Sequence, residues 1–224
     1  MKSLRLLTVR HGETDSARER RFAGSRDVAL NPRGRRQCEA VARALAGAHA
    51  AVVYASPLGR ARESAELIAA PSGLPVRVEP AFREMAFGEW EGLTRAEVAE
   101  RYPRELAAWA EAPHLIQLPG GERLDEVAAR VSAGLSALAD AQGGQTVVLV
   151  SHAIVVRLIV LEALGLGPDR LWSVDASPAG ITEIEYVDGW TTVHRMNTLI
   201  HLDALDGETT TGDPVGSGLG EVRP

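Results

Sequence analysis

Short apolar segments alternate along this chain with longer segments in which apolar residues recur every three or four positions. The short segments are rich in Leu, Val and Ile, which is typical of buried β-strands. They predict strands at residues 3–9, 51–54, 76–78, 146–150, 181–186 and 192–196. Asp188-Gly189, between the last two strands, is a hairpin signal.

The longer segments predict amphipathic helices. Apolar residues at positions i, i+3, i+4 and i+7 from Cys38 predict a helix at 33–47. Ser56 and Pro57 are typical of an N-cap and a first helical position, which predicts a helix from there to about residue 70. Further helices are predicted at 94–102, 104–111, 124–142 and 154–164.

Strands that alternate with helices are typical of an α/β fold. We expect a three-layer α/β/α sandwich with a mainly parallel central sheet, because the segment 146–150 is apolar enough to be covered on both faces. Residues 1–202 are expected to form one domain. Residues 203–224 contain many Gly, Thr, Asp and Pro and few apolar residues, which predicts a disordered acidic tail.

Composition narrows the class of protein. The 224 residues carry 24 basic and 30 acidic groups, a net charge of −6, and 45% are hydrophobic, as in ordinary globular proteins. The single cysteine, Cys38, excludes an internal disulfide and a Cys-rich zinc site, and it favours a reducing compartment. The sequence has no visible signal peptide and no apolar run of about 18 residues. We therefore expect a cytoplasmic protein that does not associate with a membrane.

Charge is unevenly distributed along the chain. Residues 1–62 carry 13 basic and 5 acidic groups, whereas residues 63–202 carry 10 and 20. A basic N-terminal third could bind nucleic acid or a small anion. Because the sequence has no nucleic-acid-binding motif and no interleaved aromatic residues, the charge favours a small anion and no nucleic-acid partner.

Three predicted strands are followed by side chains suited to phosphate chemistry: Arg10-His11, Arg60 and His152. Ligands of open α/β sheets bind beyond the carboxyl ends of the strands, so these residues are expected to meet. Arginine binds phosphate oxygens in a bidentate way, and a neutral imidazole can attack phosphorus. The helix expected from Pro57 would add N–H groups at its positive end. Each residue alone is more often structural, but their coincidence predicts phosphoryl transfer with no metal ion.

Ordered motifs extend this set over about residues 4–202. They are Leu7–Thr14 (LTVRHGET), Asp27–Gly34 (DVALNPRG), Ala55–Ala61 (ASPLGRA), Arg83–Gly92 (REMAFGEWEG), Pro119–Glu122 (PGGE) and Val150–His152 (VSH). Together they resemble the histidine phosphatase superfamily, in its phosphoglycerate mutase-like branch. The resemblance implies a phosphoglycerate mutase-like fold and a member of the phosphatase type.

The resemblance also implies a role for each matching residue. His11 would be the nucleophile that is phosphorylated during turnover, and Arg10, Arg60 and His152 would bind the phosphoryl oxygens. Glu84 would be the general acid for the leaving oxygen and then the base for the attacking water, a role that rests on the family alone.

Further substrate contacts are implied at Thr14, Gly24 and Ala153. Ala17, Ala23 and Ala153 depart from the more polar or smaller residues common in the family, which leaves the substrate open. No metal site and no cofactor are expected.

The resulting hypothesis is a histidine acid-type phosphatase, a hydrolase of a small phosphorylated metabolite. One alternative is a 2,3-bisphosphoglycerate-dependent phosphoglycerate mutase; such mutases tend to carry a longer insertion after the Arg83–Gly92 motif than this chain does. A non-catalytic phospholigand-binding protein is a weaker alternative, because every catalytic position is filled. Residues 85–121 are expected to form a cap that sets specificity. The oligomeric state cannot be inferred from the sequence.

Overall fold

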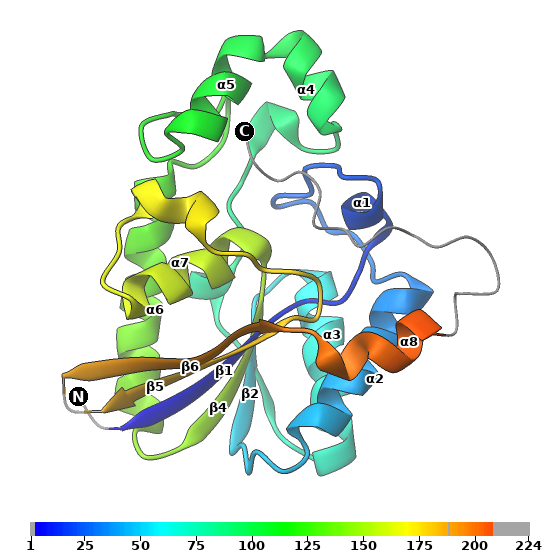
Figure 1. Ribbon diagram of the computed structural model, residues 1–224, viewed down its shortest axis with the longest axis vertical. Coiled ribbons are helices and arrows are strands. Elements are labelled where there is room, and N and C mark those ends of the chain that lie inside the picture. The colour runs from blue at the N-terminus through cyan, green and yellow to red at the C-terminus, as the bar shows by residue number, and fades with distance from the viewer. Residues whose placement is uncertain (1–2, 188, 208–224) are drawn as a thin grey trace.

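The computed structural model describes residues 3–187 and 189–207, which form a six-stranded sheet flanked by helices (Figure 1). The strand order is β3-β2-β4-β1-β5-β6. The first four strands in this order run parallel, β5 is antiparallel to β1, and β6 is antiparallel to β5. The strands are Leu4–Arg10 (β1), Val52–Ala55 (β2), Val76–Val78 (β3), Thr146–Ser151 (β4), Ile181–Val187 (β5) and Trp190–Thr198 (β6).

Helices cover both faces of this sheet, so the predicted three-layer, mainly parallel α/β fold is confirmed (Figure 1). α6 and α7 lie on one face and α2 and α3 on the other, while α4 and α5 extend beyond the carboxyl ends of the parallel strands. The helices are Asp15–Arg18 (α1), Pro32–Leu45 (α2), Gly59–Ala69 (α3), Arg95–Arg101 (α4), Pro103–Glu111 (α5), Leu124–Gln142 (α6), Ala153–Ala163 (α7) and Asp203–Gly207 (α8).

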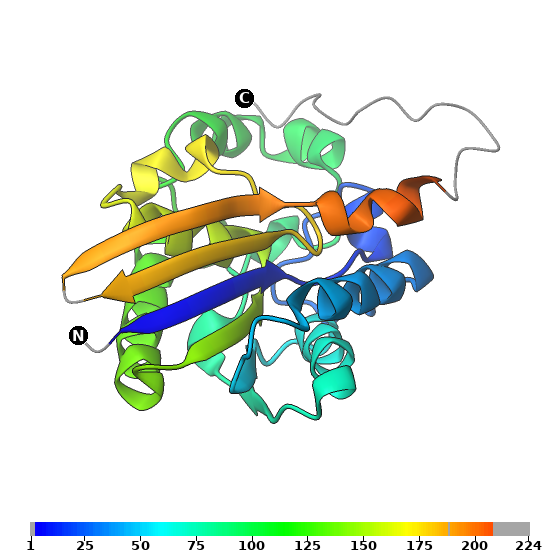
Figure 2. The same ribbon diagram turned by 60° about the horizontal axis from the view of Figure 1, so that its bottom comes forward.

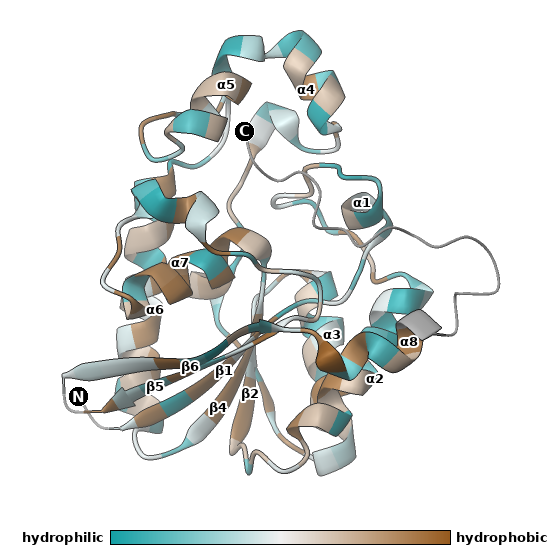
Figure 3. Ribbon diagram, viewed as in Figure 1, coloured by the Kyte–Doolittle hydropathy of each residue, from teal (hydrophilic) through white to brown (hydrophobic). Residues whose placement is uncertain are grey.

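Two hydrophobic cores lie on opposite sides of the sheet. In β1, Leu4 and Leu6 pack in the core beneath α6 and α7, whereas Leu7 and Val9 pack in the core beneath α2 and α3. This alternation follows from the two-residue period of a strand. Figure 3 shows the inner strands as mostly hydrophobic, and Figure 2 shows β6 at the edge of the sheet beside β5. Because β1 and β4 lie inside the sheet, the positions of the residues that follow them are fixed.

The start of α3 differs from the prediction. Pro57 is not the first helical residue: Leu58, after it, still has an extended backbone (φ −74°, ψ 140°), and the helix begins at Gly59. Ser56 is buried, and its hydroxyl lies 2.7 Å from Nε2 of His152 and 3.3 Å from the amide nitrogen of Leu58. Because the amide of Gly59 donates to Asp27 at 2.9 Å, this N–H is not free for phosphate as predicted.

The end of the chain also differs in part from the prediction. Residues 203–207, expected to be disordered, form the short helix α8. Residues 208–224 lie outside the described residues, as does residue 188 of the predicted Asp188-Gly189 turn. The strands on either side of that turn pair in antiparallel fashion, in agreement with a hairpin.

Close backbone packing between Gly12 and Gly34 seats the loop after β1 against the start of α2. A Cβ atom added at Gly34 would collide with the carbonyl oxygen of Glu13. We expect Gly34→Ala to lower the free energy of unfolding by about 1–3 kcal/mol, since overpacking exceeds the gain in helix propensity. Gly47→Ala, where no atom lies within 4 Å of the added Cβ, is the control. Urea unfolding that ranks both variants equal would contradict this.

Candidate active site

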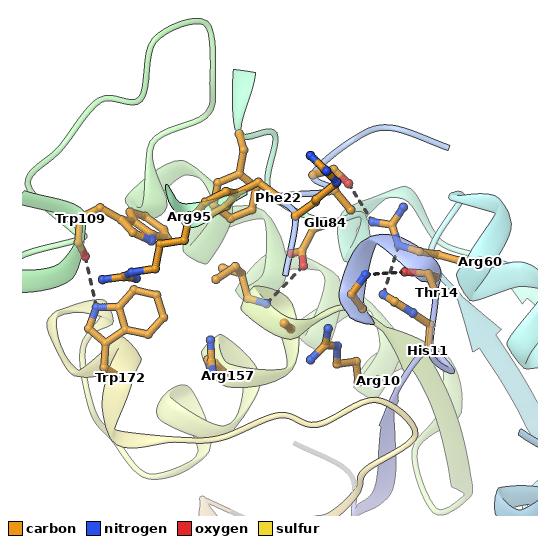
Figure 4. Close-up of a pocket in the computed structure, with 17 residues that line it drawn as sticks. Arg10, His11, Thr14, Phe22, Arg60, Glu84, Arg95, Trp109, Arg157 and Trp172 are labelled. Carbon is orange, nitrogen blue, oxygen red and sulfur yellow. Dashed lines mark hydrogen bonds between the residues drawn. The ribbon is translucent and has the colours of Figure 1, made fainter. Parts of the chain in front are cut away.

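Arg10, His11 and Arg60, predicted from the strand ends, meet at one edge of the sheet (Figure 4), and His152 lies beside His11. A cavity of about 210 Å³ opens there and contains both arginines, the first histidine and the glutamate of the predicted set. Its lining comprises Arg10, His11, Thr14, Ala17, Arg21, Phe22, Ala23, Gly24, Arg60, Glu84, Phe87, Arg95, Trp109, Ala153, Ile154, Arg157 and Trp172. The predicted cap, residues 85–121, contributes three of these side chains.

His11 is held with one ring nitrogen toward the backbone. Nδ1 lies 2.7 Å from the carbonyl oxygen of Gly12, an acceptor, so Nδ1 carries the ring proton. Nε2 therefore keeps its lone pair, and it accepts a hydrogen bond from Nε of Arg60 at 3.1 Å. Burial, and next the charges of Arg60 and Arg10, lower the pKa of His11 well below its ordinary value. The imidazole is thus neutral at neutral pH, as a nucleophile must be.

Arg60 lies almost fully buried at the first turn of α3. Nη1 donates to the carbonyl of Arg26 at 2.7 Å and Nη2 to the carbonyl of Gly24 at 2.8 Å. These carbonyls come from the loop between α1 and α2, so that loop fixes the plane of the guanidinium. Burial lowers the pKa of Arg60, while Glu84 and Asp27 oppose this effect.

Arg10 enters the cavity from the end of β1. Nη1 donates to the carbonyl of Ala176 at 2.7 Å, and Nε is buried with no hydrogen-bond partner among the described residues. Burial, and next the charge of Arg157, lower the pKa of Arg10 to about 10. The group remains charged at neutral pH and retains a donor for an incoming anion.

Glu84 lies in the irregular segment after the 3-10 turn Pro80–Phe82 and is 7% exposed. Its carboxylate accepts hydrogen bonds from the amides of Met85 at 3.0 Å and Ile154 at 3.4 Å. Burial raises the pKa of Glu84, although Arg60 and Arg10 act in the opposite direction. A carboxyl group with a raised pKa beside two arginines can exchange a proton with a bound phosphate ester.

His152 is fully buried beside His11, with ring centroids 5.1 Å apart, and it does not line the cavity. Its Nε2 lies 2.7 Å from the hydroxyl of Ser56. Nδ1 is buried and has no hydrogen-bond partner among residues 3–187 and 189–207. The ring is therefore oriented by Ser56 and has one nitrogen still to be satisfied.

The predicted substrate contacts Thr14, Gly24 and Ala153 all line the cavity. The hydroxyl of Thr14 accepts from the amide of Ala17 at 3.1 Å and so caps α1, which leaves its proton to donate. Ala153 begins α7 directly after His152. Ala17 and Ala23, two of the departures from the family pattern, also face the cavity and make its mouth less polar.

Sequence reasoning missed Arg157 and Trp172, which line the cavity on the side of Arg10 away from His11 (Figure 4). Arg157 is 9% exposed, donates from Nε to the carbonyl of Val174 at 2.9 Å, and lies over the Trp172 ring at 5.2 Å. One signal was present: Arg157 follows Ala153 by four residues, so it shares a face of the predicted helix. No such spacing in the sequence pointed to Trp172.

The two buried histidines should make the protein less stable in acid. Burial, and next Arg60, lower the pKa values of His11 and His152 well below 6.5, so the unfolded chain binds more protons in mild acid. From about pH 7.5 to 5.5 we expect a loss of about 1.4 kcal/mol of unfolding free energy for each histidine. Between these two pH values, the free energy of unfolding of His152→Gln, measured with urea in phosphate-free buffer, should therefore fall by about 1.4 kcal/mol less than that of the wild type. An equal loss in both proteins would contradict this.

Within residues 3–187 and 189–207, no three His, Cys, Asp or Glu side chains are grouped to bind a metal ion. Over the same residues, no helix has the length and hydropathy needed to cross a membrane.

Known proteins share much of this sequence and its fold. Phosphoserine phosphatase 1 of Hydrogenobacter thermophilus is 33% identical over 199 residues, covering 89% of this chain and 94% of that protein. The structure of Bacillus stearothermophilus YhfR matches with a TM-score of 0.84 and 30% identity, over 89% of this chain and 99% of that one. A mycobacterial glucosyl-3-phosphoglycerate phosphatase in complex with VO3 matches with a TM-score of 0.77 and 30% identity, over 87% and 99%.

The family assignment rests on nearly the whole domain. Residues 6–199 match the sequence profile described as histidine phosphatase superfamily (branch 1). This range begins within β1 and ends after β6, so it contains every residue of the cavity. The chain therefore belongs to the histidine phosphatase superfamily.

Proposed function

We propose that this protein is a phosphomonoester hydrolase that acts on a small phosphorylated metabolite through a phosphohistidine at His11. One observation carries the proposal: Nδ1 of His11 is tied to the carbonyl of Gly12, so the lone pair of Nε2 is available beside Arg60. Named relatives that are phosphatases support it. The positive charge at this site comes from arginines, so the reaction as proposed needs no metal ion.

In the first step, the phosphoryl group of the substrate binds between Arg10 and Arg60. Phosphate oxygens take over the Nε donor of Arg60 that now contacts Nε2 of His11. Nε2 then attacks phosphorus, the P–N bond forms, and the bond to the ester oxygen breaks. Glu84, whose pKa is raised by burial, gives a proton to the departing alkoxide.

In the second step, water attacks the phosphohistidine. Glu84, now a carboxylate, takes a proton from the water, and the P–N bond breaks to release inorganic phosphate and neutral His11. We assign His152 to the phosphoryl oxygens through Nδ1. The hydroxyl of Ser56 can donate to Nε2, which places the ring proton on the unpartnered Nδ1.

The substrate is expected to carry a second anionic group. Five arginines line the cavity against a single carboxylate, Glu84. Arg157 contacts Asp175 through Nη2 at 3.4 Å and the carbonyl of Val174 through Nε, so among the described residues its Nη1 keeps no hydrogen-bond partner and can bind a second anionic group. Phosphoserine and phosphoethanolamine differ only by a carboxylate. We expect kcat/KM to be about 10-fold or more higher for phosphoserine than for phosphoethanolamine, the effect of one hydrogen bond to a charged group. Arg157→Met should lower the ratio of these two values.

A screen of small phosphomonoesters for release of inorganic phosphate, with and without EDTA, tests the proposal. We expect hydrolysis at equal rates in both conditions, whereas loss of activity on chelation would contradict the arginine-based mechanism. 3-Phosphoglycerate, with and without 2,3-bisphosphoglycerate, tests the mutase alternative. Conversion to 2-phosphoglycerate faster than release of phosphate would overturn the assignment as a hydrolase.

A further inference from the structure

Glu84 occupies a segment of backbone that the sheet and helices do not hold. Residues 83–87 follow a 3-10 turn and belong to no helix or strand. Backbone groups of such a buried segment need other partners. The position of the Glu84 carboxyl group therefore depends on whatever holds these residues.

Arg130, on the buried side of α6, holds one side of this segment. Its Nη1 donates to the carbonyls of Ala81 and Arg83, each at 2.7 Å, and its Nη2 donates to the carbonyl of Glu84 at 3.2 Å. The carbonyl of Phe82 accepts from the hydroxyl of Ser151 at 2.8 Å. All four consecutive carbonyls, from residue 81 to residue 84, thus accept a hydrogen bond from a side chain.

Glu122 holds the other side of the segment at residues 83–87. The amide of Ala86 donates to Oε2 of Glu122 at 2.8 Å, and the amide of Glu122 donates back to the carbonyl of Ala86 at 2.9 Å. Nε of Arg130 donates to Oε1 of Glu122 at 3.2 Å, and Arg83 binds both oxygens of the same carboxylate at 2.9 and 2.7 Å. Arg130 and Glu122 are mostly buried, with side chains 19% and 16% exposed.

We propose that Arg130 and Glu122 are positioning residues for Glu84, which they act on through the backbone of residues 81–86. This inference rests on the proposed role of Glu84 as general acid. Neither residue lines the cavity, and the polar side-chain atoms of both are hydrogen-bonded to residues 81–86 and to each other, so neither is expected to touch the substrate. The planar guanidinium of Arg130 spans several carbonyls at once, a geometry that the single ammonium group of lysine does not reproduce.

Dependence on the leaving group separates positioning from general support of the fold. An alkyl phosphate such as phosphoserine needs a proton on its departing oxygen, whereas p-nitrophenolate leaves without one. Because kcat/KM covers only the steps up to departure of the leaving group, later hydrolysis of the phosphohistidine does not affect it. We expect Arg130→Gln to lower kcat/KM for phosphoserine by about 10- to 100-fold, part of the effect of a general acid. For p-nitrophenyl phosphate, the fall should be less than about threefold.

Three comparisons complete the test. Arg130→Lys should not restore activity on phosphoserine, and Arg43→Gln, on the exposed face of α2, should leave both substrates unaffected. In a Glu84→Gln background, Arg130→Gln should cause no further loss, because both changes remove the same proton transfer. Equal losses on both substrates, or additive losses in the double variant, would overturn the proposal. Full activity of His11→Ala would instead overturn the proposed function itself.

Discussion

Replacement of His11 by alanine is expected to lower kcat/KM for phosphomonoesters by about 10⁴-fold or more, as for other enzymes that lose their nucleophile. His11 is the only histidine in the lining of the described cavity, and its Nε2 contacts Nε of Arg60. Without it, water would have to attack the substrate directly, with no covalent intermediate. Release of inorganic phosphate from p-nitrophenyl phosphate and phosphoserine is the measurement.

The matched control is His194→Ala. His194 lies exposed on the edge strand β6, where it contacts Glu185, and it does not line the cavity. Its activity should equal that of the wild type. Urea unfolding of both variants shows whether a loss of activity comes from a loss of folded protein. Hydrolysis by a folded His11→Ala variant at the wild-type rate would refute the phosphohistidine mechanism.

Replacement of Glu84 by glutamine should have the second largest effect, and it should depend on the leaving group. The carboxamide of glutamine keeps the shape of the side chain but has no acidic proton to donate. We expect kcat/KM for phosphoserine to fall by about 10²- to 10⁴-fold, the usual contribution of a general acid. The fall for p-nitrophenyl phosphate should be much smaller, because p-nitrophenolate is stable as an anion.

Glu66→Gln, on the exposed side of α3, serves as the control and should not change either value. A loss in Glu84→Gln of the same size on both substrates would assign Glu84 to binding of the phosphoryl group. Activity on phosphoserine that remains at the wild-type level would remove Glu84 from the reaction altogether.

Much of the site could be predicted because strand ends impose it. β1 and β4 are neighbours in a parallel sheet, so His11 and His152 had to follow them at the same edge. Arg60 joins them because α3 follows β2, which pairs with β4. Period-two burial in β1 and β4 fixed the register that places these residues. These are short-range patterns that a sequence expresses directly.

Other features depend on contacts between distant segments, which a local pattern does not encode. Glu84 looks like a solvated residue of a loop, but it is buried. Its backbone carbonyl is bound by Arg130, 46 positions away, and its carboxylate by the amide of Ile154, 70 positions away. Ser56 matched the pattern of an N-cap, but its hydroxyl is taken up by His152, a residue 96 positions away. The helix after it begins later than predicted, at Gly59. Only the resemblance to a family pointed to Glu84.

The central claim, a phosphoryl group carried on His11, can be measured directly. The enzyme is mixed with an excess of substrate, quenched within milliseconds into alkali, where phosphohistidine persists, and digested for mass spectrometry. We predict a phosphoryl group on the peptide that contains His11, at no more than one per chain, and its absence in His11→Ala. A phosphoryl group found on another residue, or rapid turnover with no phosphorylated peptide, would contradict the account.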